Sequence, residues 1–368
     1  MVVVVVVILA KIKTKPTMFS SGQPIKVGVV VALSGYASNW GEGELRALHI
    51  AIDDYKDKIK LPIQLIVEDT KSNGIGTVNA TSKLTDVDHV QVIFGPTWGD
   101  SFQGGHPITD KAKVTEITPS AALETIKDNK FSYLFSTWWP QENEVKSLLD
   151  FMSNAGETKI SVISDQDPFN LQFTNDFIAQ AEAMGKNGMI GSKTIIPIGV
   201  KEFRTYIAKI KAENPSAIFI QLQDTSSRGP FMKELKEQNV KAQVYGTADA
   251  EDSDNIKKFP GFFDGLFYAF PSYSDDLSYS VLLKKLMAKY GSNVSQGPSF
   301  VNAYNAAIML LEVLKNGART GTEIRDALTK IHVPGVGIKE LSFDSKHQIK
   351  NVKYIIKTVK NNQFVEIK

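Results

Sequence analysis

The sequence predicts an α/β fold with two successive doubly wound parallel sheets. Apolar, β-branched segments alternate with amphipathic ones along most of the 368 residues, and this alternation is typical of parallel sheets covered by helices. A first series of strands ends near residues 133–136, and the cycle restarts with a helix predicted over 141–155. The length of the chain also favours two domains, each with its own core.

The stretch 25–55 sets the pattern. Residues 25–33 form a nearly continuous β-branched run, which a strand buried on both faces requires. A small-residue loop is predicted over 34–40, followed by a helix whose apolar stripe includes Leu48 and Ile52. Helix-start N–H groups are unpaired, and open α/β sheets bind ligands at the carboxyl edge. The loop after this strand is therefore a candidate binding segment.

The remaining elements follow the same period, and right-handed crossovers are expected between parallel strands. In the first half, strands are predicted at 63–68, 90–94, 114–118 and 133–136, with a helix at 76–88. In the second half, strands are predicted at 159–164, 192–196, 217–221, 243–245 and 266–270, with helices at 141–155, 170–184, 202–212 and 230–238. Three helices at 277–290, 300–315 and 322–331 and two strands near 341–343 and 352–359 complete the chain.

Residues 1–10 are almost purely apolar, but a membrane-spanning helix needs about 20 such residues. Lysines follow this run instead of preceding it. We interpret residues 1–24 as the remnant of an export signal, or an N-terminal anchor, and a linker. An extra strand or a simple tail is the alternative, and the segment is left out of the fold prediction.

The composition is that of a soluble globular protein, with 42% hydrophobic and 22% charged residues. A net charge of +2 gives no reason to expect nucleic acid as a partner. The absence of cysteine excludes disulfides, thiolate catalysis and a lipid-modified cysteine anchor.

All four tryptophans of the chain fall in predicted strand-end loops of the first half, at one edge of one sheet: Trp40, Trp98, Trp138 and Trp139. Loop tips normally favour small polar residues. Indoles offer a flat apolar face, an N–H donor and a π surface that attracts cations. We expect them to form a ligand-facing wall, with ordinary packing as the alternative for any one of them.

The strand ends of the second half are acidic and amide-rich instead. They carry Asp165, Gln166, Asp167, Gln223, Asp224, Asp249 and Glu251. An ordinary solvated rim is the alternative for each residue. The shared position at carboxyl strand ends favours a place in the binding site for Asp167, Gln223 and Asp249.

The strand 25–33 with its L-S-G end, the acidic end of the strand near 63–69 and the I-F-G-P segment at 93–96 carry a resemblance. Together they resemble type I periplasmic solute-binding proteins, in the Leu/Ile/Val-binding branch. The resemblance lies in the ordered series up to about residue 368, not in any single motif. It implies lobe 1 from residues 25–138 and 273–340, and lobe 2 from residues 139–272 and 341–368. The chain would cross between them near 138–141, 270–274 and 338–343, forming a hinge that closes around a ligand.

The same resemblance implies roles for individual residues. The turn after I-F-G-P would hold a ligand α-carboxylate through the hydroxyl of Thr97 and the N–H groups of Trp98 and Gly99. The next strand end keeps a hydroxyl at Ser120, followed by Ala121, and has Ala122 where the family usually has threonine.

At the ammonium end, Gln141 stands where an aspartate often follows the first crossing, and Phe169 stands where a tyrosine is common. Asp249 or Glu251 could supply the family's acidic group. With the carboxylate end half kept and the ammonium end altered, an ordinary α-amino acid fits this site poorly.

Signatures of enzymes are missing from the sequence: it contains no G-x-S-x-G elbow, no phosphate-binding loop, no H-E-x-x-H and no dinucleotide fingerprint. No residues have metal-ligand spacing, and we predict no cofactor and no metal. His106, close to Trp98 in sequence, is the one histidine considered for the site.

The predicted function is that of an extracytoplasmic substrate-binding protein of an ABC importer. A monomer on the periplasmic or extracellular face of the membrane would capture a small polar or amphipathic, amino-acid-like solute and deliver it to the permease and ATPase. One alternative is a ligand-sensing receptor module of the same fold, anchored by the N-terminal run. The other is an enzyme that uses Asp167, Asp224 or Asp249 as general acid or base.

Overall fold

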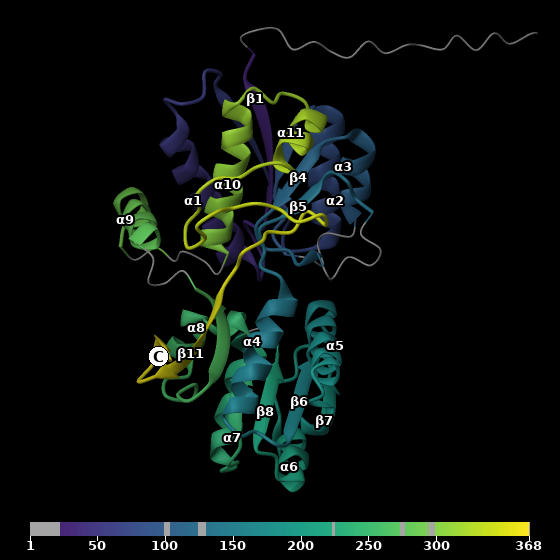
Figure 1. The fold of residues 1–368 in the computed structure, drawn as a ribbon, viewed down its shortest axis with the longest axis vertical. Coiled ribbons are helices and arrows are strands. Elements are labelled where there is room, and N and C mark those ends of the chain that lie inside the picture. Colours follow the sequence, from purple (N-terminus) through teal and green to yellow (C-terminus); the bar gives the residue numbers. More distant parts are fainter. Residues whose placement is uncertain are drawn as a thin grey trace, which may run out of the picture.

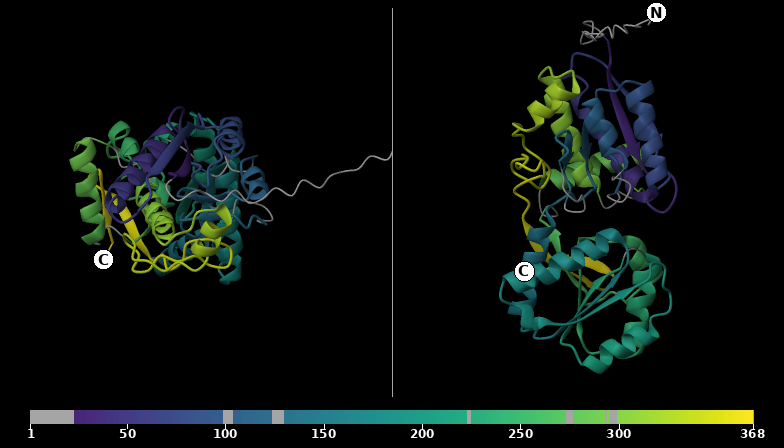
Figure 2. Two further views of the ribbon diagram at one scale, coloured as in Figure 1. Left: turned by 90° about the horizontal axis from the view of Figure 1, so that it is seen from above. Right: turned by 90° about the vertical axis from the view of Figure 1, so that its right-hand side faces the viewer.

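The computed structural model describes residues 23–98, 104–123, 130–222, 225–272, 277–292, 294 and 299–367. Figure 1 shows two α/β lobes, one above the other, each built on its own sheet. The right-hand view of Figure 2 shows the strands of the lower lobe between two layers of helices. The predicted fold class is therefore confirmed: two lobes with mainly parallel sheets.

Lobe 1 is organised around five parallel strands in the order β2-β1-β3-β4-β5. The strands are β1 (Ile25–Val31), β2 (Ile63–Asp69), β3 (Val92–Phe94), β4 (Thr115–Thr118) and β5 (Leu134–Ser136). The helices on this lobe are α1 (Ser38–Tyr55), α2 (Gly74–Ser82) with the π-helix η1 (Lys83–Val87), α3 (His106–Ala112), α9 (Leu277–Tyr290), α10 (Phe300–Lys315) and α11 (Gly321–Leu328).

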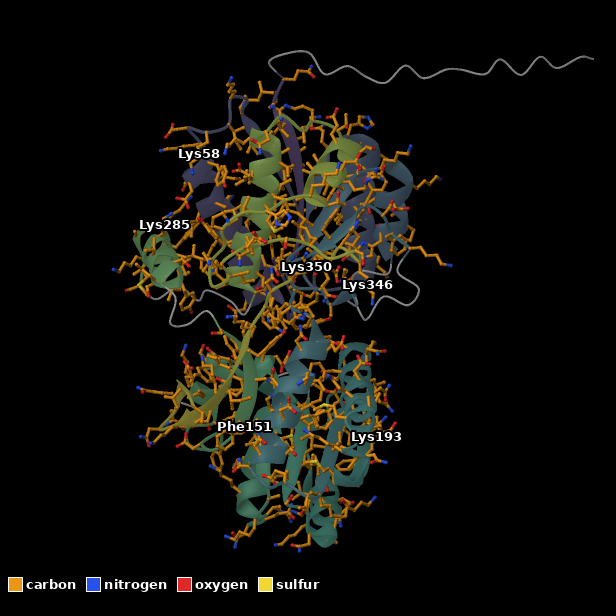
Figure 3. The ribbon with its side chains drawn as sticks, viewed as in Figure 1. Lys58, Phe151, Lys193, Lys285, Lys346 and Lys350 are labelled. Atoms are coloured by element: carbon orange, nitrogen blue, oxygen red, sulfur yellow. The ribbon has the colours of Figure 1, made fainter. Side chains whose placement is uncertain are left out.

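Burial explains why the late helices return to lobe 1. The valines of β1 are fully covered, and α10, which is buried along nearly its whole length, packs against α1. Polar contacts fix the outer layer. Lys285 of α9, labelled in Figure 3, pairs with Asp54 of α1 at 2.6 Å, and the Tyr304 hydroxyl of α10 donates to the same carboxylate at 2.7 Å. Segments about 250 residues apart in sequence thus form one core.

Lobe 2 is organised around a sheet in the order β12-β11-β10-β9-β8-β6-β7. Its strands are β6 (Ile160–Asp165), β7 (Ile190–Ile196), β8 (Ala217–Gln221), β9 (Gln243–Gly246), β10 (Phe267–Pro271), β11 (Tyr354–Lys360) and β12 (Gln363–Glu366). Its helices are α4 (Gln141–Asn154), α5 (Pro168–Ala183), η4 (Asn187–Met189), α6 (Arg204–Glu213), α7 (Thr225–Glu237), η5 (Ala248–Ala250) and α8 (Ser253–Lys258). Among the described strands of this sheet, the antiparallel pairs are β10 with β11 and β11 with β12. Phe151 of α4, labelled in Figure 3, packs on Phe267 of β10 with ring centroids 5.4 Å apart.

Several element predictions need correction. Helices α3 and α8 and strand β12 were not predicted, because each is short and lacks a full period of apolar residues. Helix α7 begins at Thr225, five residues before the predicted start, because Pro230 lies inside the helix and not at its first position. Trp40 lies in the first turn of α1 and not in a loop.

The third crossing also differs from the prediction near 338–343. Residues 341–349 stay on lobe 1, where Ser136 of β5 bridges to Gln348 and the Phe135 ring stacks on His347 at 4.1 Å. The segment gives a partner to β5, which is otherwise the edge strand of its sheet. The expected short strand at 341–343 is a set of isolated bridges, and the chain enters lobe 2 only just before β11.

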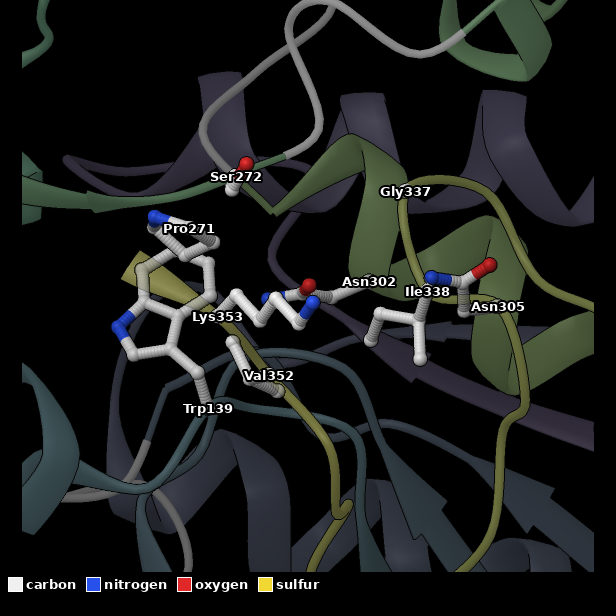
Figure 4. Close-up of a pocket in the computed structure, with 9 residues that line it drawn as sticks. All are labelled: Trp139, Pro271, Ser272, Asn302, Asn305, Gly337, Ile338, Val352 and Lys353. Atoms are coloured by element: carbon white, nitrogen blue, oxygen red, sulfur yellow. The ribbon is translucent and has the colours of Figure 1, made fainter. Parts of the chain in front are cut away.

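Hydrogen bonds tie the three crossings to one another. The Tyr354 hydroxyl of the third crossing donates to the Pro140 carbonyl of the first at 2.9 Å. The Ser272 amide of the second crossing donates to the Lys353 carbonyl of the third at 2.8 Å. A cavity of about 10 Å³, room for about one water molecule, lies where the crossings meet (Figure 4). Bending at the hinge therefore has to move all three segments together.

Replacing Tyr354 by Phe should loosen this hinge. The ring stays, but the bond to Pro140 is lost, and we expect a loss of about 1 kcal/mol in the free energy of unfolding in urea. Tyr206→Phe is the matched control, because that half-buried ring packs on the core without a hydrogen bond from its hydroxyl in the described chain. Equal effects of the two changes would contradict a role for the Tyr354 bond.

Candidate functional site

The candidate site lies at the carboxyl edge of the lobe 1 sheet, beside the hinge. Gly41 brings α1 to this edge: a Cβ on Gly41 would lie only 2.1 Å from the carbonyl oxygen of Ala32, so no larger residue fits. The first turn of α1 can therefore rest directly on the end of β1. This contact fixes the neighbouring Trp40 at the sheet edge.

The turn after β3 is held by its neighbours on both sides. The Thr97 hydroxyl accepts from the amide of Ala32 at 3.1 Å, and the Trp98 amide donates to the Ser120 hydroxyl at 3.1 Å. Trp98 has a φ of 65°, in the left-handed region that bulky residues rarely adopt. Such conformations persist where the surroundings enforce them, and they cluster at functional sites.

The four indoles form one continuous array. Ring centroids are 5.1 Å apart for Trp40 and Trp98, 5.8 Å for Trp40 and Trp138, and 3.9 Å for Trp138 and Trp139. Tyr36, which is mostly exposed, extends the array beyond Trp98 at 5.3 Å. At the other end, Trp139 lies 6.3 Å from Phe270, the penultimate residue of β10 in lobe 2. The array thus runs from the rim of lobe 1 through the hinge to lobe 2.

A buried carboxyl group that the sequence analysis missed lies beneath this array. Glu44 of α1 is completely buried and receives the hydroxyls of Thr97 at 2.5 Å and Ser299 at 2.7 Å, and also bonds to the Ser120 hydroxyl. Glu44 lies four residues before Leu48 and eight before Ile52, so it falls on the apolar stripe of the helix, which was the available signal.

Glu44 changes the expected roles of two site residues. Thr97 and Ser120 each accept a backbone N–H and also bond Glu44, so neither hydroxyl is left open for a ligand carboxylate. Burial raises the pKa of Glu44 from its ordinary 4.5 to about 7, although the three hydroxyl bonds act to lower it. The group is therefore neutral over most of the acidic range.

The acids at the facing edge of lobe 2 are also engaged. Asp167 caps α5, accepting the amides of Phe169 at 2.9 Å and Asn170 at 3.2 Å. Asn170 continues a chain of side-chain bonds to Gln221 at 2.9 Å, and Gln221 accepts the Thr247 hydroxyl at 2.9 Å. This polar chain joins the carboxyl ends of β6, β8 and β9.

Asp249, the other predicted acid, pairs with an arginine that the sequence analysis missed. The buried Arg228 of α7 donates to the Asp249 carboxylate at 2.5 Å and to the Leu222 carbonyl at 2.7 Å. Its charge cancels that of Asp249, so the expected acidic wall is largely neutral here. No sequence pattern links a helix residue to a loop 21 residues away.

At the site, another buried carboxylate joins the hinge to lobe 2. Glu144, in the first turn of α4, accepts the Trp139 indole N–H at 3.0 Å and the amide of Ala248 at 2.7 Å. Ala248 opens η5, just after β9. One residue therefore connects the indole array to η5, which carries Asp249.

The other predicted site residues are placed as follows. Ala121 and Ala122 are buried beside Ser120, Gln141 is buried at the start of α4, and Phe169 is half-buried, 6.1 Å from Phe173. Gly99, Gln223 and Asp224 lie outside the described residues. His106 is not a site residue: it is fully buried within lobe 1, and its Nδ1 lies 2.7 Å from the Glu116 carboxylate.

The described residues contain no group of three or more His, Cys, Asp or Glu side chains that could hold a metal ion. In the same part of the chain, no helix combines the length and the apolar character that crossing a membrane requires.

Two α/β lobes, a three-segment hinge and an indole array at the junction give the architecture of a two-lobed solute-binding protein. The chain belongs to the periplasmic binding protein family, whose model matches residues 24–363.

Known proteins are similar at low identity. A leucine-specific-binding protein from Salmonella typhimurium is 21% identical over 272 residues, 72% of this chain and 72% of its own. The substrate-binding protein of a Streptococcus pneumoniae branched-chain amino acid transporter, solved with isoleucine, has a TM-score of 0.80 at 19% identity, covering 94% of this chain and 100% of its own. An ABC transporter solute-binding protein from R. palustris, solved with benzoate, has a TM-score of 0.81 at 17% identity, covering 94% and 96%. At such identities the structural similarity establishes the fold alone.

The raised pKa of Glu44 predicts a pH dependence of stability. The folded state holds this proton up to about pH 7 and the unfolded chain only to about 4.5, so the stabilisation is complete below pH 4.5 and lost as pH rises through 7. Relative to Glu44→Gln, the free energy of unfolding should fall by up to about 3 kcal/mol over this interval. Urea unfolding at a series of pH values measures it.

Glu42→Gln on the exposed side of α1 is the control for this series, because its side chain is 47% exposed and, among the described residues, its carboxylate pairs with Arg46. A difference between wild type and Glu44→Gln that does not change with pH would show that folding does not raise the pKa of Glu44.

Proposed function

We propose that this protein is the solute-binding component of an ABC importer and captures a small solute on the indole array by closing its two lobes. The observation that carries the proposal is that all four tryptophans of the chain form one array at the carboxyl edge of lobe 1. Family membership and the transporter proteins among the structural neighbours support it. The enzyme alternative loses support because Asp167 and Asp249 are held in structural bonds.

Closure follows from how the parts are connected. The indole array begins on lobe 1 and reaches β10, and Glu144 bonds both Trp139 and Ala248. A ligand on the array would therefore contact the segments that reorient when the hinge bends. Burying it between the lobes would remove water and strengthen each hydrogen bond to it.

The proposal includes a location and partners. The protein acts outside the cytoplasm as a monomer, residues 1–24 serve export or anchoring, and the loaded protein docks on a permease and ATPase. Adjoining reading frames for a permease and an ATPase would favour this role over that of a sensor. The finer assignment to branched-chain amino acids is weakened by Glu44, which engages the hydroxyls of Thr97 and Ser120.

A ligand panel with two readouts tests solute capture. Because all four tryptophans belong to the array, a captured solute should change intrinsic fluorescence and raise the melting temperature together. The panel contains amino acids, amides, sugars and aromatic acids. If none of them changes either signal, capture of these solutes is contradicted.

Trp40→Ala should lower the affinity for the captured solute about thirtyfold. The ring between Trp98 and Trp138 is lost, and a central aromatic anchor contributes about 2 kcal/mol of binding free energy. Phe151→Leu is the control: it also replaces an aromatic ring by a smaller side chain, but at a partly buried position against the core of lobe 2, on Phe267. Equal losses of affinity in both variants would mean that Trp40 acts through stability and not through contact.

A further inference from the structure

Two indole N–H groups of the array are buried donors that have no acceptor among the described residues. Within the described chain, Nε1 of Trp98 and Nε1 of Trp138 are covered from solvent and have no hydrogen-bond partner, and Trp138 as a whole is 5% exposed. Trp139, in contrast, donates its Nε1 to Glu144. A buried donor without an acceptor costs about 1–3 kcal/mol, and native proteins rarely keep one without a reason.

The two donors belong to a single surface. Trp98 and Trp138 both contact Trp40. The angle between the ring planes is 83° for Trp98, an edge-on contact, and 36° for Trp138, a tilted one. Trp98 also carries the backbone strain of its positive φ. An unpaired donor and a strained backbone at one residue are two separate costs, and a ligand acceptor that bonds this residue would explain why the fold retains them.

The charges nearby favour an acceptor over an ammonium group. Glu44 is bonded to three hydroxyls, Asp167 caps α5, and Asp249 is paired with Arg228, so none of these three acids is open to a ligand cation. Helix α1 starts at the site, and its first turn has no acidic residue to offset the positive end of its dipole. An oxygen anion is therefore the better electrostatic match.

We infer that the solute is a flat aromatic ring bearing a carboxylate, whose ring stacks on the array and whose oxygens accept the indole N–H groups of Trp98 and Trp138. The inference rests on the proposed function and adds the substrate class. It also assigns these two tryptophans as the residues that select a carboxylate over an ammonium group.

The test is a matched series of ligands titrated by calorimetry against the full chain. Benzoate, phenylacetate and indole-3-acetate are each compared with the corresponding amide and amine, and L-leucine and L-phenylalanine are included. We expect at least one carboxylate to bind, with its amide weaker and its amine at least tenfold weaker. Trp98→Phe and Trp138→Phe should each weaken the carboxylate about tenfold or more, and weaken the amide less, because bonds to charged acceptors are stronger.

A second pair of variants replaces either indole by its benzothienyl isostere, which keeps the shape and lacks the N–H. These variants separate the loss of the hydrogen bond from the loss of packing. They also provide the test if a phenylalanine variant fails to fold. Unchanged carboxylate affinity in both isosteric variants overturns the inference, and so does preference for an amine or for an α-amino acid. Tight binding of leucine alone would overturn the substrate class and leave solute capture standing. If no ligand in this series binds, the substrate class is also overturned. If, in addition, no compound of the wider panel changes either signal, solute capture itself is contradicted.

Discussion

The buried carboxyl group of Glu44 is the constraint on which the candidate site depends. Through the hydroxyls of Thr97, Ser120 and Ser299 it ties together the ends of β3 and β4 and the start of α10, and through Thr97 it reaches the end of β1. Without such a centre, four loop ends at a sheet edge would have few contacts to fix their relative positions. The backbone of Trp98 is held by Ser120, so the position of its indole follows from this one polar cluster.

The hinge extends this rigidity into lobe 2. Trp138 stacks on Trp139, and Trp139 donates to Glu144, which also holds the first residue of η5. The outer side of the hinge is fixed by Tyr354 and Pro140. A domain closure that rotates α4 must therefore either carry Trp139 with it or break its bond to Glu144. In both cases the state of the indole array and the angle between the lobes are physically coupled.

Local signals in the sequence were sufficient for much of the fold. The β-branched run at β1 and the period of α10 are strong patterns, and both elements lie where the sequence places them. The grouping of the tryptophans was also predictable, because the ends of parallel strands meet at one edge. In contrast, the short apolar pattern at 341–343 did not reveal that residues 341–349 lie beside β5 in lobe 1. The role of Arg228 likewise depends on its pairing with Asp249. Such long-range pairings cannot be derived from spacing along one chain.

The state of the acidic side chains shows why counting charges at strand ends was misleading. Asp167 and Asp249 lie at the predicted edge, yet one caps a helix and the other is neutralised by a buried arginine. A carboxylate in low dielectric must be bonded or paired, so a buried acid near a site is usually already committed. The buried donors differ from the buried acids, because the N–H groups of Trp98 and Trp138 are not yet bonded within the described chain. Each indole carries a single N–H and cannot accept a hydrogen bond. Among the described residues, these two unpaired donors of the array call for acceptors. They are a better guide to the solute than the number of acids in the loops.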